Sequence, residues 1–227
     1  FLSIFTSNLD EFFMIRVGSL FDLQSVNAGA LDSKTGMTPA EQLDKLYASV
    51  RRLYKKRDEV YFALERRLRG AGIFNLSIAE LSIEEYRFVR KYYEQEIAPI
   101  LSPQIVDAHH PFPHLQSKVL HIGTMLKEGD KSLFGVIPIP QSLPDIVRIP
   151  GKGLRYIRIE DIILDNVETI FSMYRISEKT ILCITRNADI NPDDEAFDVN
   201  QDFREKMQRL LYERRRPSAV RLELNSP

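Results

Sequence analysis

The chain has 227 residues, of which 44% are hydrophobic and 28% charged, and its net charge is −1 at pH 7. This composition is that of an ordinary globular protein and excludes wholesale disorder and collagen-like or low-complexity sequences. The balanced charge gives no indication of a nucleic-acid partner. No apolar run reaches the ~18–20 residues that span a bilayer, and the single cysteine, Cys183, fits a reducing compartment.

The first hundred residues have the pattern of helices. Residues 7–10 have the form of a capping box, and apolar residues at helical spacing follow them, which predicts a first helix that begins there. Residues 38–69 combine a Thr-Pro start with a heptad-like apolar seam, which predicts a second, long helix. Residues 82–98 predict a third. We expect the three to pack as an antiparallel bundle over residues 1–100.

The second part of the chain, residues 101–227, is rich in strand-like segments separated by turns. The predicted strands are residues 119–126, 133–139, 146–149, 154–159, 180–186 and 219–224. Helices are predicted between them near residues 160–173 and 199–216. The fold class is therefore predicted to be α+β with two domains, a helical N-terminal domain and an α+β domain with a mixed sheet.

The common catalytic motifs are absent. The chain has no phosphate-binding loop, no dinucleotide fingerprint, no H-E-x-x-H and no paired C-x-x-C. A Gly-Lys-Gly sequence at residues 151–153 is able to hold a phosphate, but a hairpin turn is the favoured interpretation. His110 and His114 are four residues apart, but Pro111 and Pro113 exclude a helical metal pair. We assign no catalytic residue and no metal ligand.

A basic run lies within the second predicted helix. Arg51 and Lys55, like Arg52 and Lys56, are four residues apart and share a helix face. This arrangement fits either contact with a polyanion or an ordinary solvated helix face, and the solvated face is favoured because acidic residues interleave nearby.

Asn8 stands at the predicted start of the first helix. Free backbone N–H groups and the positive end of the helix dipole favour anions at such a position. Asn8 is equally suited to cap the helix. Physical reasoning from the residues does not choose between these two interpretations.

Residues 7–17, SNLDEFFMIRV, strongly resemble the start of the bacterial polyphosphate kinases of the first class. Further stretches resemble the same family in the same order. They are residues 101–113 with the groups LSP, VD and HPFP, residues 155–163 (RYIRIEDII), residues 185–190 (TRNADI), the predicted helix that ends in three arginines, and residues 219–223 (AVRLE). The resemblance spans essentially the whole chain.

The resemblance implies an enzyme that reversibly transfers the terminal phosphate of ATP to polyphosphate, with magnesium and through a phosphohistidine. It implies a helical N-terminal domain, a head domain that mediates dimerisation, and two C-terminal catalytic domains. The phosphorylated histidine belongs to those later domains, so the resemblance implies that the present chain alone is inactive. It also implies that Asn8 contacts the nucleotide, ATP or ADP. The implied location is the cytoplasm, with peripheral association with the inner membrane face left open.

The chain begins inside an apolar segment without an initiator Met, and we expect it to be a piece of a longer protein. Two other classes of function stay open at this stage. One is a stand-alone protein-interaction module. The other is a polyanion-binding domain that uses the basic face of the helix at residues 38–69.

Overall fold

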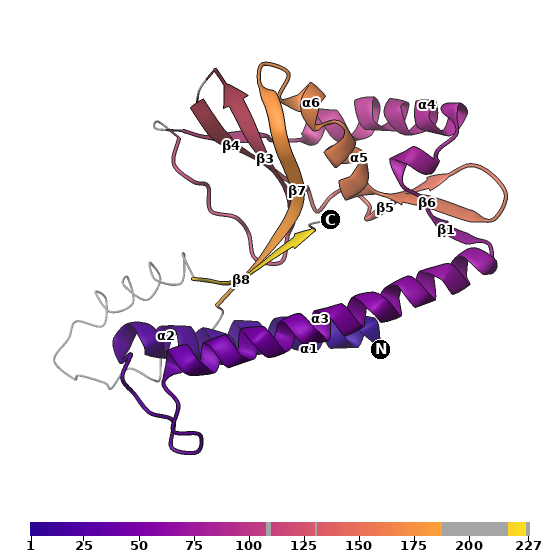
Figure 1. Ribbon diagram of the computed structural model, residues 1–227. Helices are drawn as coiled ribbons and strands as arrows, with labels where there is room; N and C mark the ends of the chain where they lie inside the picture. The colour runs from indigo at the N-terminus through magenta and orange to yellow at the C-terminus, as the bar shows by residue number, and fades with distance from the viewer. Residues whose placement is uncertain (108–109, 130, 188–217, 226–227) are drawn as a thin grey trace. The chain divides into compact units, whose positions relative to one another are not determined.

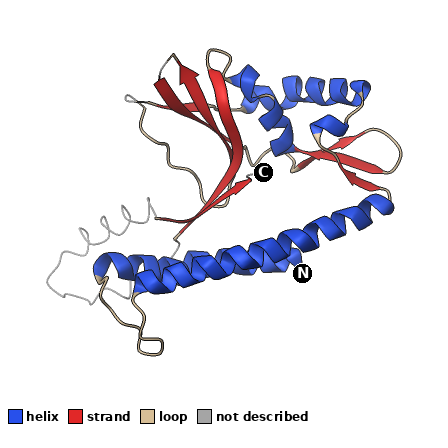
Figure 2. Ribbon diagram, viewed as in Figure 1, coloured by secondary structure: helices blue, strands red, loops and turns tan. Residues whose placement is uncertain are grey.

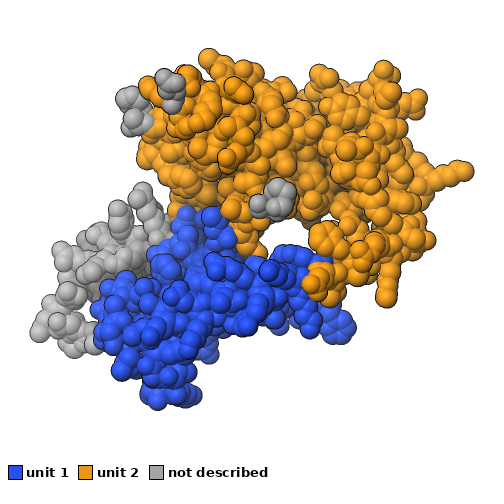
Figure 3. Space-filling view, in the orientation of Figure 1, with its two compact units in different colours: residues 1–58, 184–222 blue, residues 59–183, 223–227 orange. Residues whose placement is uncertain are grey.

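The computed structural model describes residues 1–107, 110–129, 131–187 and 218–225. The chain divides into two compact units, shown in Figure 3. Unit 1 comprises Phe1–Asp58 and Ile184–Leu222, and unit 2 comprises Glu59–Cys183 and Glu223–Pro227. One helix and two strands contribute residues to both units.

The helices of unit 1 come from the start of the chain (Figure 1). They are α1 (Leu2–Phe12), a π-helical segment η1 (Phe13–Val17), α2 (Gly18–Val26) and the first part of α3 (Pro39–Gly70). The first three follow one another without a break. The long helix begins as predicted, since the N–H of Thr38 donates to the Glu41 carboxylate at 2.9 Å and the N–H of Glu41 donates to Thr38 Oγ1 at 3.3 Å. No described helix is long and apolar enough to cross a membrane.

The predicted helix start at residues 7–10 is wrong, because α1 already begins at Leu2. Phe5, Leu9 and Phe13 are four residues apart, so the helical spacing extends back through the capping-box sequence. Asn8 therefore lies inside a helix, with its side chain exposed. It is neither a helix cap nor part of a helix N-terminal anion site, and both interpretations that rested on that position lapse.

The core of unit 1 joins its helices to the start of strand β8 (Ala219–Asn225). Its buried side chains are Leu9, Phe13, Val17, Leu43, Val50 and Val220. The predicted apolar seam of the long helix is buried only in its first half. Its later members Leu53, Val60 and Leu64 are 45%, 47% and 45% exposed.

Two sheets form most of unit 2 (Figure 2). The larger has the strand order β2-β4-β3-β7-β8, and the smaller has the order β1-β6-β5. The further strand bounds are β1 (Ile73–Asn75), β2 (Gln104–Val106), β3 (Leu120–Glu128), β4 (Lys131–Pro138), β5 (Ile146–Ile149), β6 (Leu154–Arg158) and β7 (Arg175–Arg186). In the smaller sheet β1 pairs parallel with β6 while β5 pairs antiparallel with it. The sheet is therefore mixed, as predicted.

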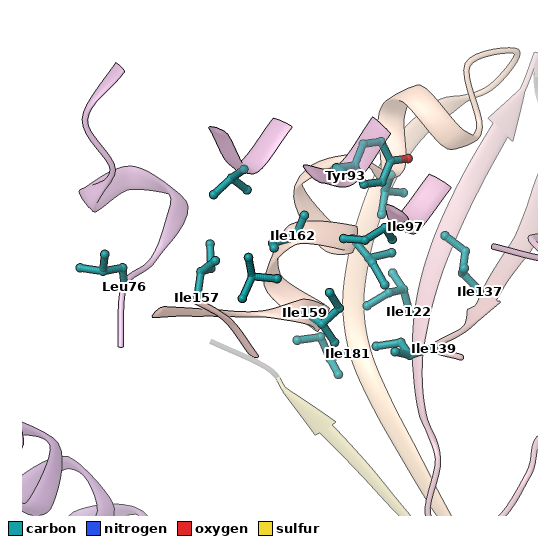
Figure 4. Packing of buried hydrophobic residues seen from close by; sticks show 14 of the residues in the cluster. Leu76, Tyr93, Ile97, Ile122, Ile137, Ile139, Ile157, Ile159, Ile162 and Ile181 are labelled. Carbon is teal, nitrogen blue, oxygen red and sulfur yellow. The ribbon is translucent and has the colours of Figure 1, made fainter. Parts of the chain in front are cut away.

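Helices pack against these sheets to close the core of unit 2 (Figure 4). They are η2 (Ile78–Glu80), α4 (Ile83–Tyr92), η3 (Tyr93–Ile97), η4 (Ala98–Ile100), α5 (Ile159–Asp165) and α6 (Val167–Ile170). Ile97 from η3, Ile162 from α5 and Ile122 from β3 are all fully buried in this core. The α+β class, with a helical N-terminal region and a mixed-sheet domain, is confirmed.

The helix expected to complete the N-terminal bundle instead contributes to the core of unit 2. Val89, Tyr93 and Ile97 recur every four residues along α4 and η3, and all three belong to that core. The spacing identified an amphipathic helix correctly, but spacing alone does not say which apolar surface covers it. The helix predicted near residues 199–216 lies outside the described residues.

We expect an ion pair in unit 2 to make stability depend on pH. Arg69 Nη1 donates to Glu80 Oε1 at 2.8 Å, and this bond, with the N–H of Ser77, lowers the pKa of Glu80 to about 2. A carboxyl whose folded pKa lies below its unfolded value stabilises the fold above that unfolded value, and the contribution is lost as pH falls through the folded pKa. Because the Glu80 side chain is 39% exposed, the contribution is about 1 kcal/mol or less.

Urea unfolding of Glu80→Gln and of the unchanged chain, measured between pH 6 and pH 2, tests this expectation. The variant should be less stable at pH 6, and the difference should shrink from about pH 4.5 downward. Glu178 supplies a control, since it is exposed in a strand and forms no ion pair with a described residue, so Glu178→Gln should leave stability unchanged. A difference that stays constant down to pH 2 would contradict the assignment.

Candidate functional site

Asn8 and Asp10 point in different directions from the same helix. Successive residues of a helix are about 100° apart, so the side chain of Asp10 leaves α1 about 200° around from Asn8. Asn8 is exposed, whereas Leu9 is buried and the Asp10 side chain is 18% exposed. Asn8 therefore faces outward when Asp10 faces the interior of unit 1.

The inward carboxylate belongs to what we call the Arg221 cluster, which consists of Asp10, Tyr54, Thr185 and Arg221. Arg221 is only 7% exposed. Its Nη2 donates to Asp10 Oδ1, its Nη1 donates to Tyr54 Oη at 3.0 Å, and its Nε donates to Thr185 Oγ1 at 3.0 Å. The guanidinium carbon also lies 4.7 Å from the ring centroid of Phe13. One buried cation thus connects α1, α3, β7 and β8.

A second polar contact fixes the helical segment beyond η1. Asn187 Nδ2 donates to Asp22 Oδ2 at 2.5 Å, and the N–H of Asn187 donates to the carbonyl of Ser218 at 2.8 Å. Gly18 lies so close that a Cβ at this position would collide with the Asn187 side chain. Only glycine, which has no Cβ, allows the helix to lie this close to Asn187, directly after the π-helical segment. Such segments are frequent at functional sites.

The arrangement determines which side chain is available to a ligand. The donors of Arg221 point at protein acceptors, so the cluster supports structure. The side chain of Asn8 has no hydrogen-bond partner among the described residues, and its amide offers both an acceptor and two donors. An amide of this kind is suited to the edge of a nucleobase or to a ribose hydroxyl. It does not titrate and does not itself supply proton-transfer chemistry.

The basic residues of the predicted polyanion contact form a basic ridge, which consists of Arg51, Arg52, Lys55 and Lys56 on α3. All four are exposed. None forms an ion pair with a described acidic residue, in contrast to Arg57, which pairs with Asp58 at 2.8 Å. At 100° per residue the ridge lies on the side of α3 opposite to the buried seam. No hydrogen bond among the described residues joins the ridge to Asn8.

Two histidines of unit 2, His110 and His121, are held by local contacts. His110 Nδ1 lies 2.9 Å from Asp107 Oδ1, within one turn. His121 is 2% exposed, its Nδ1 lies 2.8 Å from the carbonyl of Val119, and burial lowers the pKa of its imidazole. In the described part of the chain no group of three or more His, Cys, Asp or Glu side chains is placed to hold a metal ion.

Two other features of the sequence have structural explanations. The Gly-Lys-Gly sequence at residues 151–153 forms the turn between β5 and β6, which confirms the favoured hairpin interpretation. Cys183 is a half-buried thiol within β7.

Reasoning from the sequence did not identify the Arg221 cluster. One signal was available, because Arg221 stands between Val220 and Leu222 in a strand-like run where a charged residue is unusual. A buried arginine requires an acidic partner, but nothing local to β8 indicates that the partner is Asp10. The two residues are 211 positions apart in the chain.

Comparison with known proteins gives consistent results. The sequence model of the polyphosphate kinase N-terminal domain matches residues 1–76, and that of the polyphosphate kinase middle domain matches residues 84–227. A curated polyphosphate kinase of Bacillus anthracis is 33% identical over 99% of this chain and 33% of its own length. One of Synechocystis is 34% identical over 100% of this chain and 32% of its own length. The chain thus spans about a third of the length of these relatives.

A solved structure agrees with the sequence comparisons. The crystal structure of polyphosphate kinase from Porphyromonas gingivalis superposes with a TM-score of 0.71 at 20% identity. The match covers 92% of this chain and 32% of that one, so it shows a shared fold. Because the two family models together match nearly every residue, the chain belongs to the polyphosphate kinase family and contains its N-terminal and middle domains.

Proposed function

We propose that the chain is the N-terminal and middle portion of an enzyme that reversibly transfers the terminal phosphate of ATP to polyphosphate, and that Asn8 contacts the nucleotide. The observation that carries the second statement is the exposed, unpartnered amide of Asn8 on a helix whose rotation is fixed by buried contacts. With helix capping excluded, the amide of Asn8 is left available to a ligand.

The rest of the proposal assigns the remaining roles. The family resemblance supports placing the phosphohistidine and the residues that bind magnesium in the later domains of the enzyme, outside this chain. We assign homodimerisation to residues 101–227. Sedimentation equilibrium of the intact chain tests whether the chain self-associates. The enzyme acts in the cytoplasm on ATP, ADP and polyphosphate, and the present chain alone is expected to form no polyphosphate.

In the complete enzyme, Asn8→Ala is expected to raise the Michaelis constant for ATP and to leave kcat nearly unchanged. A hydrogen bond that is equally strong in the ground state and the transition state contributes uniform binding. One neutral hydrogen bond changes affinity by about two- to twelve-fold. Because Asn8 lies on an exposed helical surface, where alanine is the better helix former, the melting temperature should be unchanged or slightly higher.

The neighbouring Ser7 is the matched control, since it is exposed on the same helix. Ser7→Ala should leave the Michaelis constant for ATP unchanged, with a melting temperature that is likewise unchanged or slightly higher. A normal Michaelis constant in a well-folded Asn8→Ala enzyme would exclude the nucleotide contact.

We further propose that the basic ridge contacts the polyphosphate chain. The supporting observation is that its four cations are exposed and have no ion-pair partner among the described residues. Changing all four to glutamine should weaken binding of sodium polyphosphate. It should also reduce the slope of log affinity against log salt by about 0.7 for each phosphate group that the ridge no longer neutralises.

Isothermal titration calorimetry at several sodium chloride concentrations measures both effects. A control variant with the same net charge changes four exposed cations elsewhere to glutamine, namely Arg66, Arg67, Arg87 and Lys91. Equal salt slopes for the two variants would show that only overall charge matters and would exclude the ridge as a site.

A further inference from the structure

We propose that Arg221 is a positioning residue for nucleotide binding, which sets the rotation of α1 and so the direction in which Asn8 points. This inference rests on the proposed nucleotide contact of Asn8. Arg221 does not touch the nucleotide in this proposal. It acts through Asp10, which is two residues from Asn8 on the same helix.

Two side chains of α1 and η1 contact the same guanidinium. Asp10 accepts from Nη2, and the ring of Phe13 lies 4.7 Å from the guanidinium carbon. Because the two residues are three positions apart, their side chains leave the helix on the same side, about 60° apart. A rotation of the helix about its axis would break both contacts together.

The guanidinium is itself held in place, so Asp10 has a fixed partner. Nη1 and Nε donate to Tyr54 and Thr185, each at 3.0 Å, and Nη2 donates to Thr185 at 2.6 Å. The planar fork of arginine allows these bonds to form at once, which lysine does not permit. The backbone beside it is fixed too, because Tyr47 Oη donates to the carbonyl of Val220 at 2.6 Å.

A helix with a defined rotation presents Asn8 in one direction. The side chain of Asn8 leaves the helix about 200° from that of Asp10, so fixing the carboxylate inward turns the amide outward. Removal of the Arg221 guanidinium leaves the apolar core of unit 1 intact, but that core is less directional than a charge-assisted hydrogen bond. Asn8 would then sample several directions, and binding would lose the benefit of preorganisation.

The test is a double-mutant cycle in the complete enzyme, with Asn8→Ala and Arg221→Met made singly and together. If Arg221 acts through Asn8, Arg221→Met raises the Michaelis constant for ATP by no more than the about two- to twelve-fold expected for Asn8→Ala. In the Asn8→Ala background it then has no further effect, because the hydrogen bond that it positions is already absent. The fold-changes of the two single variants are therefore expected not to multiply.

Arg155→Met controls for a general loss of stability. Arg155 is a partly buried arginine of unit 2 that pairs with Glu85 at 2.7 Å. Its replacement should lower the melting temperature and leave the Michaelis constant for ATP unchanged. Should Arg221→Met fail to fold, Asp10→Asn replaces it in the cycle, since this change removes the charge and keeps an oxygen acceptor.

The outcomes separate the two proposals. If Asn8→Ala leaves the Michaelis constant unchanged, the nucleotide contact itself is wrong. If Asn8→Ala raises it but Arg221→Met does not, or if the two fold-changes multiply, the nucleotide contact stands and the positioning role is overturned.

Discussion

Replacing Asp10 by alanine is expected to lower the free energy of unfolding by about 3 kcal/mol, because it removes a carboxylate that pairs with a buried cation. Arg221 is 7% exposed and has no route to full hydration in the folded state. Its hydrogen bonds to Tyr54 and Thr185 remain, but these acceptors are neutral. Urea unfolding of the chain at neutral pH measures the loss.

Replacing Arg221 by methionine should lower the free energy of unfolding by less than replacing Asp10 by alanine. In Arg221→Met the remaining carboxylate of Asp10 is 18% exposed and is able to recruit water, while methionine fills part of the buried volume. The double variant Asp10→Ala with Arg221→Met should therefore be more stable than the sum of the single losses indicates. Additive losses, or a larger loss for Arg221→Met than for Asp10→Ala, would contradict this account.

Most elements of the fold could be predicted from the sequence because their signals are local. A run rich in β-branched residues predicted a strand at residues 146–149, and β5 has those bounds. The strands β1 and β2 were not predicted, because each has only three residues. A run this short shows no readable alternation, and its pairing partner decides its conformation.

The error at the start of α1 shows how competing local signals are resolved. Residues 7–10 carry the side chains of a capping box, but Phe5 and Leu9 also continue an apolar helix face. Packing of that face in the core of unit 1 outweighs the contribution of a cap, which is worth about 1 kcal/mol. The correction bears on function, because it removes the structural explanation for Asn8.

The candidate site also has one part that the sequence predicted and one part that it did not. The role of Asn8 came from a family resemblance, and its exposure in the structure is compatible with that role. The Arg221 cluster depends on contacts between residues far apart in the chain, such as Tyr54 and Arg221, which are 167 positions apart. Periodicity and spacing report on neighbours along one element. They do not report on which elements meet.

A second large loss of stability is expected from Gly153→Ala in the turn between β5 and β6. Gly153 has a φ of 79°, in the left-handed region where a Cβ is strained. A Cβ built at this position would lie 2.6 Å from the carbonyl oxygen of Gly72, a backbone atom that accepts from the N–H of Leu154 at 2.9 Å. Backbone strain of about 1–2 kcal/mol and displacement of this hydrogen bond together should lower the free energy of unfolding by about 3 kcal/mol.

Gly129→Ala separates the two causes. Gly129 has a φ of 58°, and a Cβ there would meet no atom within 4 Å, so its replacement by alanine introduces the backbone strain alone. Urea unfolding should therefore show a loss of about 1 kcal/mol for Gly129→Ala and about three times as much for Gly153→Ala. Equal losses would show that the approach to Gly72 contributes nothing. If the difference is found, close backbone packing between β1 and β6 explains why glycine stands at this turn, with no phosphate needed to account for it.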